Sequence, residues 1–556
     1  MSGVRCQLQK WERGIGTGIS VMALVGQCLC CGAADYAPKL RADLDTAIEA
    51  GKPLELPAGR FLLGTPADPK VRHVITLRTR ERVAIRGVPG KTELIITDPR
   101  LALCRIMQTK SVEISGIVID YETAPYAQGT VVGVDPAKLT FDLDIDEGFP
   151  LLDEPVFAHG ADWGMTVDPQ SASFLKDLTW NALWTGSWTH LHDRIFRLSL
   201  VEGSRHKAAI AGIEKDDRYC QLPSSGAPQL ISSYLCASVK ISDVTIHGSV
   251  GLAIVCGRSG SVTLQRIRLI PRDRTNRLIA GNRDGIHLSG CRGPILIEDC
   301  EMTKLGDDGI NINVHGFVVT KVLAPDNVEA TLDHVSPEVG DRLQVTNREE
   351  GRLRGTAKIA EITPVGKQWL GRQRLGFRLD RPIPGISVGD CINDLDSGGE
   401  GFVIRRCKIY GLRRYGALVH GSGTIENNTF TDLYGYGIVA NGHHFSPKPG
   451  HPKEGPMPYS LTIKDNVIER VARNKMYSRV QMHPGAIQVV GYRRRFKVAP
   501  KPIIHNVTIT GNRIKDPPVN HVFLGAVSDA TLSGPGLNDE TVRVANCERI
   551  RVLSGK

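Results

Sequence analysis

Two short motifs bring three carboxylates into a pattern suited to acid–base chemistry. Asp284 precedes one glycine, and Asp307 and Asp308 precede another. Three neighbouring carboxylates repel one another, so at least one is expected to keep its proton while the others ionise. Glycosidic cleavage needs such a set, because an acid protonates the leaving oxygen and a base activates water. A lone Asp-Gly pair, by contrast, is usually turn chemistry, and stacked aspartates also bind calcium or cap turns.

The offset between the two motifs matches a repeat in the chain. Asp284 and Asp307 are 23 residues apart, the same interval that separates the strand starting at Val239 from the next, at Val262. Strand repeats of this length predict parallel coils stacked in a solenoid, about 4.8 Å apart. The two aspartates should therefore lie on neighbouring rungs of one face. Asp308 can join them only if the chain bends there, because successive residues of a regular strand face opposite sides.

The repeat itself is a short strand in which apolar and polar residues alternate, as expected when one face is buried. It occurs at 112–119, 239–246, 262–269, 295–302, 402–409, 424–430, 461–468 and 507–514. One fixed position often carries cysteine or asparagine, which we interpret as a structural ladder formed by Cys300, Cys407, Asn428, Asn466 and Asn512. A helix is predicted over 38–50, ending at Gly51, where it would cap the open end of the solenoid.

The sequence predicts an all-β protein, a right-handed parallel β-helix (a pectin-lyase-like solenoid) with an N-terminal capping helix and two inserted antiparallel β-barrels. The barrels are expected where the repeat is interrupted, and tryptophans clustered in the first interruption are interpreted as barrel core rather than as sugar-stacking residues. The expected organisation is a signal peptide at 1–34, cap and first coils at 35–126, a barrel at 127–228, catalytic coils at 229–314, a second barrel at 315–397 and C-terminal coils at 398–556.

The N-terminal residues predict export to the periplasm or the exterior. Basic residues precede a weakly apolar run, and small residues suit cleavage after Ala34. Cys28, Cys30 and Cys31 leave open a lipoprotein anchor, although none has the usual small residue before it. No segment is apolar for long enough to predict an integral span. The remaining cysteines are dispersed, which argues against a zinc site or a disulfide framework.

The charge pattern narrows the partners. The formal net charge of +10 would attract nucleic acid, a membrane surface or an acidic polysaccharide. The chain carries no nucleic-acid-binding motif, so that partner is excluded and an oligosaccharide or polysaccharide is expected. No metal and no cofactor is expected, and the sequence does not predict the oligomeric state.

At these motifs the chain resembles known glycosidases. Asn282-x-Asp284 followed by Gly306-Asp307-Asp308 is similar to the polygalacturonases of glycoside hydrolase family 28. The closer resemblance is to the α-1,3-galactosidases of family 110, which have Asp-Gly-Ile-His and then an Asp-Asp pair running into Asn-x-His-Gly. The segments 413–421 and 425–430 also look like that family. The resemblance covers roughly residues 38–515 and implies a β-helix with inserted barrels.

The family resemblance also implies roles for single residues. Asp307 would be the general acid, and Asp284 with Asp308 would activate the water, with inversion at the sugar carbon. The implied substrate-binding residues are Asn282, His287, Asn311, His315, Arg413, Arg414 and His420. One departure stands at 441–455, where the family's Trp-Tyr-Glu-x-Gly element is not matched. A different sugar, or a sulfated or uronic-acid polymer, therefore stays open beside galactose.

The sequence thus predicts an exported inverting glycoside hydrolase acting on α-galactosidic or related glycans, including sulfated or acidic ones. Two alternatives remain. A polysaccharide lyase or epimerase would need a base near the sugar C5 and a cation, such as calcium or the arginines Arg413 and Arg414, to neutralise a uronate. A non-catalytic carbohydrate-binding β-helix would need neither, and fold alone does not choose among them.

Overall fold

The computed structural model describes residues 34–554 except 159, 172–173, 225, 334, 348, 367–371, 443–453, 475–482, 494–495 and 518. The expected signal peptide, with its candidate lipidation cysteines, lies outside the described residues apart from Ala34. Among the described helices, none combines the length and apolar character needed to cross a bilayer.

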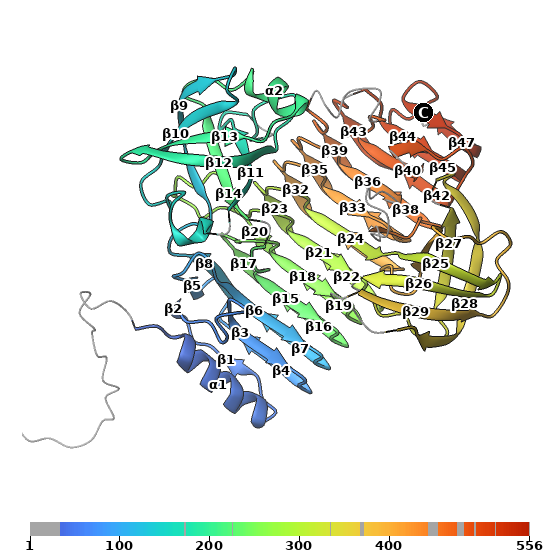
Figure 1. Cartoon of the computed structure of the whole chain (residues 1–556), viewed down its shortest axis with the longest axis horizontal. Helices are drawn as coiled ribbons and strands as arrows, with labels where there is room; N and C mark the ends of the chain where they lie inside the picture. Colours follow the sequence, from blue (N-terminus) through green and yellow to red (C-terminus); the bar gives the residue numbers. More distant parts are fainter. Residues whose placement is uncertain are drawn as a thin grey trace, which may run out of the picture. The chain divides into compact units, whose positions relative to one another are not determined.

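The described chain winds into coils whose strands align in three long parallel sheets (Figure 1). The expected parallel β-helix is confirmed by this pairing. The first sheet runs in the order β1 (Leu54–Glu55), β4 (Arg82–Arg86), β7 (Ser111–Ser115), β16 (Ser238–Ser242), β19 (Ser261–Gln265), β22 (Ile295–Glu298), β31 (Phe402–Arg405), β34 (Gly423–Glu426), β38 (Leu461–Lys464), β42 (Ile504–Thr510), β45 (Val527–Gly534) and β47 (Glu548–Ser554).

The second sheet follows the first after a short turn in every coil up to the one that begins with β42. Its order is β2 (Gly59–Leu63), β5 (Thr92–Ile96), β8 (Ile117–Tyr121), β17 (Thr245–Ile246), β20 (Arg268–Leu269), β23 (Glu301–Thr303), β32 (Lys408–Tyr410), β35 (Thr429–Thr431), β39 (Val467–Glu469) and β43 (Arg513–Lys515).

The third sheet carries the two motifs. Its order is β3 (His73–Arg78), β6 (Ala102–Met107), β15 (Ile231–Tyr234), β18 (Ile254–Gly257), β21 (Ile286–Ser289), β24 (Ile310–His315), β33 (Ala417–Val419), β36 (Ile438–Gly442), β40 (Ile487–Arg493), β44 (Val522–Gly525) and β46 (Val542–Ala545). Two short strands add to it in antiparallel pairs, β37 (Glu454–Gly455) on β24 and β41 (Lys497–Val498) on β40.

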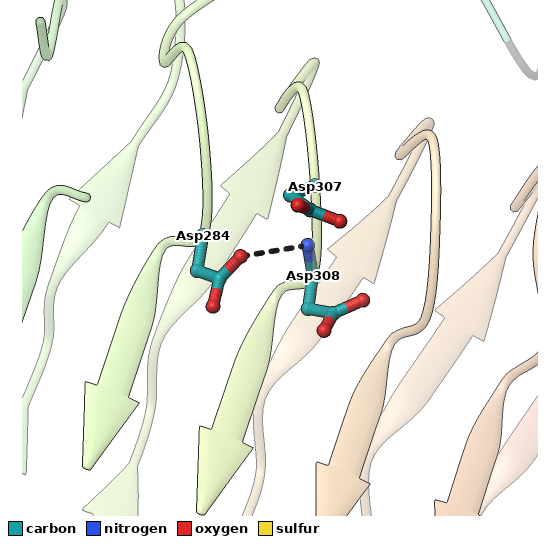
Figure 2. Close-up of side chains that lie close together, drawn as sticks. All are labelled: Asp284, Asp307 and Asp308. Carbon is teal, nitrogen blue, oxygen red and sulfur yellow. Dashed lines mark hydrogen bonds between the residues drawn. The ribbon is translucent and has the colours of Figure 1, made fainter. Parts of the chain in front are cut away.

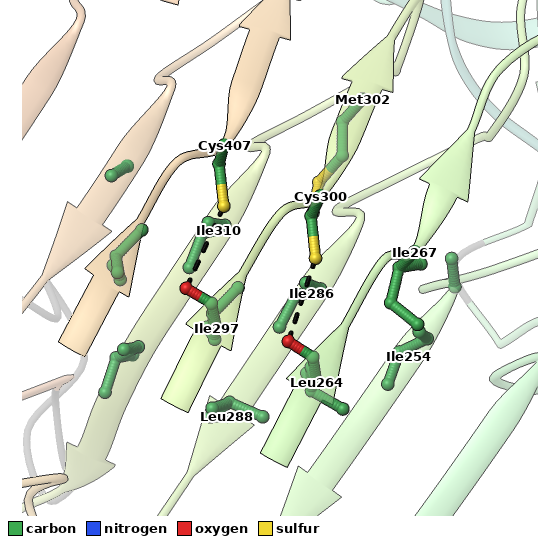
Figure 3. Packing of buried hydrophobic residues seen from close by; sticks show 14 of the residues in the cluster. Ile254, Leu264, Ile267, Ile286, Leu288, Ile297, Cys300, Met302, Ile310 and Cys407 are labelled. Carbon is green, nitrogen blue, oxygen red and sulfur yellow. Dashed lines mark hydrogen bonds between the residues drawn. The ribbon is translucent and has the colours of Figure 1, made fainter. Parts of the chain in front are cut away.

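Inward-facing side chains of all three sheets fill the solenoid, and the predicted ladders lie there. Cys300 and Cys407 point their sulfurs at the carbonyl oxygens of Leu264 and Ile297, at 3.8 and 3.9 Å (Figure 3). In the asparagine ladder, Oδ1 of Asn466 accepts from Nδ2 of Asn428 at 3.0 Å, and Oδ1 of Asn512 accepts from Nδ2 of Asn466 at 2.8 Å. The predicted structural role of these residues is confirmed.

The capping helix is α1 (Ala37–Glu49), beside the first coils (Figure 1). It begins with a proline in its first turn, a position that lacks an intrahelical N–H partner anyway. Its buried face includes Leu40 and Leu44, which pack into the core of the solenoid. Gly51 follows the helix with φ of +66°, the left-handed conformation that commonly ends helices.

Two closed antiparallel barrels interrupt the coils (Figure 1). The first comprises β9 (Ala127–Asp135), β10 (Thr140–Ile145), β11 (Ala161–Val167), β12 (Leu183–His192), β13 (Ile195–Leu200) and β14 (Arg218–Pro223), with the short helices η1 (Pro155–Phe157) and α2 (Ser204–Ile210). The second comprises β25 (Phe317–Ala324), β26 (Asn327–Asp333), β27 (Arg342–Asn347), β28 (Arg352–Pro364), β29 (Arg372–Leu379) and β30 (Cys391–Asp394).

The first barrel shares its core with the solenoid. Its buried aromatic and aliphatic residues pack in one cluster with Leu418 of β33, Val439 of β36, and Tyr434 and Tyr436 from the segment between β35 and β36. The hydroxyl of Tyr434 donates to the carbonyl of Leu178 at 2.8 Å. This barrel therefore lies against the third sheet, beside the two aspartate motifs.

Candidate active site

The three aspartates stand where two neighbouring coils enter the third sheet. Asp284 comes two residues before β21, and Asp308 two residues before β24. These strands pair in parallel with Ile286 opposite Ile310, so the two motifs lie on adjacent rungs as predicted. The segment around Asp307 belongs to no strand, and all three carboxylates gather there (Figure 2). The bend that the prediction required is present.

One oxygen from each of the three carboxylates lies within 4.8 Å of the others. They line a cavity of about 330 Å³, a volume typical of small-molecule sites. The other lining residues are Ala227, Gln229, Gly251, Leu252, Arg283, His287, Asn311, Arg414, Leu418 and Glu454.

Asp284 is hydrogen-bonded to His287, which lies in the strand that follows it, β21. Its side chain is buried, the residue being 5% exposed, and Oδ2 lies 2.8 Å from Nδ1 of His287. Burial raises the pKa of Asp284, and the hydrogen bond to His287 only partly opposes this. Burial would lower the pKa of His287, but the bond to Asp284 outweighs it and the pKa is raised. The two side chains therefore form a buried hydrogen-bonded pair at the edge of the trio.

Asp307 is surrounded by positive charge. Its Oδ1 accepts from Nη2 of Arg413 at 3.2 Å and from Nη1 of Arg414 at 3.3 Å. Burial alone would raise the pKa of Asp307, but Arg414, Arg413 and Arg283 together lower it below its usual value. Asp307 is thus the aspartate held most firmly in its ionised form.

Asp308 has the opposite character. It is 2% exposed, and its Oδ1 accepts from the backbone N–H of Tyr415 at 3.2 Å, with Nε of Arg414 more distant at 3.7 Å. Burial raises the pKa of Asp308 well above its usual value, and the neighbouring Asp307 and Asp284 raise it further against the pull of Arg414. Asp308 is thus the aspartate that keeps its proton. The site separates the trio into a protonated and an ionised member, as the clustering predicted.

Three of the seven residues predicted to bind substrate line the cavity: His287, Asn311 and Arg414. Arg413 lies behind Asp307 and donates through Nε to the carbonyl of Gly306 at 2.6 Å. It therefore reaches the cavity through Asp307.

The other three lie outside the lining. Asn282 is buried and donates to the carbonyls of Pro125 and Val250, at 2.9 and 3.0 Å, which fastens its coil to its neighbours. His420 is fully buried, with Nε2 3.3 Å from Oε2 of Glu454. His315 pairs with the same glutamate in the β24–β37 ladder.

Sequence reasoning missed three residues of this site. Arg283 was hidden inside the first motif, and the signal that could have found it is its place directly before Asp284. Glu454 was noted only within the divergent stretch, but it reaches the cavity because β37 pairs with β24. Trp163, from the first barrel, lies over the guanidinium of Arg413 at 4.1 Å from the ring centroid. Only the fold reveals that contact.

The oxygen spacing of the trio is one that a cation could use, since calcium and magnesium take carboxylate ligands. The residues around the trio favour arginine, rather than a metal ion, as the partner of these carboxylates. Arg413 and Arg414 already bond to Asp307, and the raised pKa of Asp308 opposes the ionised ligand that a metal requires. A second acidic group, formed by Asp341, Asp394 and Asp396, is likewise bonded to arginine. Arg292 pairs with Asp341 and Asp394, and Arg342 pairs with Asp396.

Curated relatives share sequence with this chain over more than half of its length. An α-1,3-galactosidase B of Bacteroides thetaiotaomicron is 23% identical over 380 residues, covering 65% of this chain and 60% of the relative. An α-1,3-galactosidase A of Bacteroides fragilis is 22% identical over 424 residues, covering 70% and 68%. The predicted resemblance is confirmed. The chain spans about three fifths of the length of the first relative, and no family model matches it.

Solved structures match this chain at lower sequence identity. A family 28 exopolygalacturonase of Yersinia enterocolitica has a TM-score of 0.35 and 13% identity, covering 94% of this chain and 77% of that one. A mannuronan C-5 epimerase module of Azotobacter vinelandii has a TM-score of 0.38 and 10% identity, covering 94% and 97%.

Proposed function

We propose that this protein is a glycoside hydrolase that cleaves α-galactosidic bonds or closely related glycans. The observation that carries the proposal is the divided surroundings of the trio: Asp308 is buried, which raises its pKa, whereas Asp307 beside it bonds to two arginines, which lower its pKa. Glycosidic cleavage requires a protonated and an ionised carboxyl group side by side. The confirmed resemblance to α-1,3-galactosidases supplies the bond class.

In the proposed mechanism Asp308 donates its proton to the leaving oxygen and Asp307 accepts one from water. Asp284, bonded to His287, holds the rung beside them and accepts the N–H of Asp308 at 3.3 Å. The family resemblance implies the reverse, with Asp307 as acid. The electrostatics favour Asp308 as the acid, because Arg413 and Arg414 bond directly to Asp307 and stabilise its ionised form.

A leaving-group comparison separates the two assignments. Loss of a general acid costs little on a substrate whose leaving group needs no protonation, and much on a sugar leaving group. We expect Asp308→Asn to retain activity on an aryl α-galactoside and to lose at least about 100-fold on an α-1,3-linked disaccharide. The variant Asp307→Asn should lose activity on both substrates. The control is Asp243→Asn, at a surface turn paired with Arg266. The reverse pattern between Asp307 and Asp308 would return the acid role to Asp307.

The proposed stereochemistry is inversion, and it rests on the family resemblance. Inverting pairs usually lie about 6.5–9.5 Å apart and retaining pairs about 5–5.5 Å. The oxygens here lie within 4.8 Å, so distance alone favours retention. The first-formed anomer, followed by NMR, decides between the two courses.

Export and substrate charge complete the proposal. The basic, small-residue N-terminus supports a signal peptide, which N-terminal sequencing of protein recovered outside the cytoplasm would test. The arginines around Asp307 support the acidic or sulfated glycans among the proposed substrates.

Those arginines also favour a second candidate, a lyase or epimerase acting on uronates. Arg283 and Arg414 line the cavity and could neutralise a sugar carboxylate. A lyase would form an unsaturated product that absorbs in the ultraviolet, whereas a hydrolase forms none. Binding without any cleavage would leave the non-catalytic carbohydrate-binding role.

A further inference from the structure

We propose that Trp163, in β11 of the first barrel, is a positioning residue that acts through Arg413 on the carboxylate of Asp307. The inference rests on the proposed function of the trio. It makes the inserted barrel part of the catalytic apparatus, although Trp163 itself does not line the cavity.

Trp163 and Arg413 form a cation–π stack, and the guanidinium of Arg413 also makes two hydrogen bonds. Trp163 is 3% exposed, and the guanidinium carbon of Arg413 lies 4.1 Å from its ring centroid. The same guanidinium donates to the carbonyl of Gly306 at 2.6 Å and to Oδ1 of Asp307 at 3.2 Å. The ring therefore holds one face of a cation whose edge bonds to the aspartate.

A second contact ties the ring to the same bend. A methyl group on Gly306 would lie 3.1 Å from Cη2 of Trp163, so the ring rests against the backbone directly before Asp307. Trp163 thus supports this carboxylate both through the arginine and through the chain.

The barrel itself is fastened to the solenoid near this point. The hydroxyl of Tyr126 donates to the carbonyl of Ile279 at 3.0 Å, and Asn282 donates to the carbonyl of Pro125 at 2.9 Å. A side chain carried by β11 is therefore held in place relative to the motif that contains Asp284. Long arginine side chains lose rotamer freedom when ordered, and the packed ring limits where this one can go.

The consequence falls on the charge state of Asp307. Arg413 is one of the arginines that lower the pKa of this aspartate. Without the ring, the guanidinium gains other rotamers, and the pKa of Asp307 rises towards its usual value. As the pH falls, Asp307 then becomes protonated at a higher pH than in the wild type.

The activity test compares Trp163→Leu with Trp163→Phe, which keeps a ring. For Trp163→Leu we expect kcat/KM to fall about threefold to tenfold, chiefly through kcat, and the acidic limb of its pH profile to move to higher pH. Trp163→Phe should recover most of the loss. The matched control is Trp180→Leu, which removes a ring stacked 4.5 Å from Arg205 in the same barrel. An unchanged limb in Trp163→Leu would overturn the proposal.

A double-mutant cycle tests the coupling without any substrate. The shifts of the thermal midpoint in Trp163→Leu and Asp307→Asn should be non-additive in the double variant, whereas Trp180→Leu and Asp307→Asn should be additive. Additive shifts in the first cycle would overturn the positioning role. Non-additive shifts in a protein that cleaves no glycan would refute the proposed function and leave the coupling intact.

Discussion

Substituting Gly306 by alanine should disable the site from one residue away. A Cβ at Gly306 would lie 2.2 Å from the carbonyl oxygen of Asn282 and 3.1 Å from Trp163. Ordinary contact begins at 3.4 Å, so the backbone must move by about 3.4 − 2.2 = 1.2 Å. Asp307 follows directly and moves with it. A misplacement of about 1 Å can cost on the order of 100-fold in rate, and overpacking typically costs about 1–3 kcal/mol of stability.

The assay is kcat/KM on an α-galactoside, together with the thermal midpoint, for Gly306→Ala and a control. Gly186→Ala in the first barrel is the matched control, because its added Cβ would meet nothing closer than 3.6 Å. We expect a loss of about 30- to 100-fold in the first and near-wild-type activity in the second. Full activity in a folded Gly306→Ala protein would refute the view that this bend positions Asp307.

Three further predictions concern protonation and the core. Burial raises the pKa of Asp308, so the stability that this group contributes is present at low pH and is lost as the pH rises through its pKa in the folded protein. The variant Asp308→Asn should therefore have a higher thermal midpoint than the wild type at neutral pH, although its activity on disaccharides is lost. Burial also raises the pKa of Asp394 to about 7, so the wild-type midpoint should fall as pH rises through about 7, and this fall should be smaller in Asp394→Asn. Asn466→Ala should lower the unfolding free energy by about 2–4 kcal/mol, because it breaks the buried ladder, whereas exposed Asn276→Ala should change it little in denaturant titrations.

The solenoid could be predicted because its signal is local and repeated. Alternating residues fix which face of each strand is buried, and the recurrence of Asp284 and Asp307 at the repeat interval fixes their rungs. The asparagine and cysteine ladders follow from the same register, since a parallel stack puts equivalent positions side by side.

The electrostatics of the trio could not be predicted in the same way. Arg413 is 106 residues from Asp307, and it reaches this aspartate because the coil after the second barrel stacks directly on β24. That contact is the reason why we propose Asp308, rather than Asp307, as the general acid. Glu454 lines the cavity through a short antiparallel pair outside the repeat, which no periodicity marks.

The sequence also could not predict which way the side chains point where the chain leaves the strands. His420 matched the family pattern, but it faces the interior and contacts Glu454 rather than the cavity. Trp163 was predicted to be part of the barrel core and is buried there, but its ring also stacks on the guanidinium of Arg413.

Cleavage of a galactosidic bond with Asp308 as the acid can be followed in one NMR time course, in which the wild type and Asp308→Asn act on an α-1,3-linked galactose disaccharide. We expect free galactose and a saturated second sugar from the wild type, and at least about a 100-fold slower release from Asp308→Asn. An unsaturated sugar product, or equal rates in the two proteins, would contradict it.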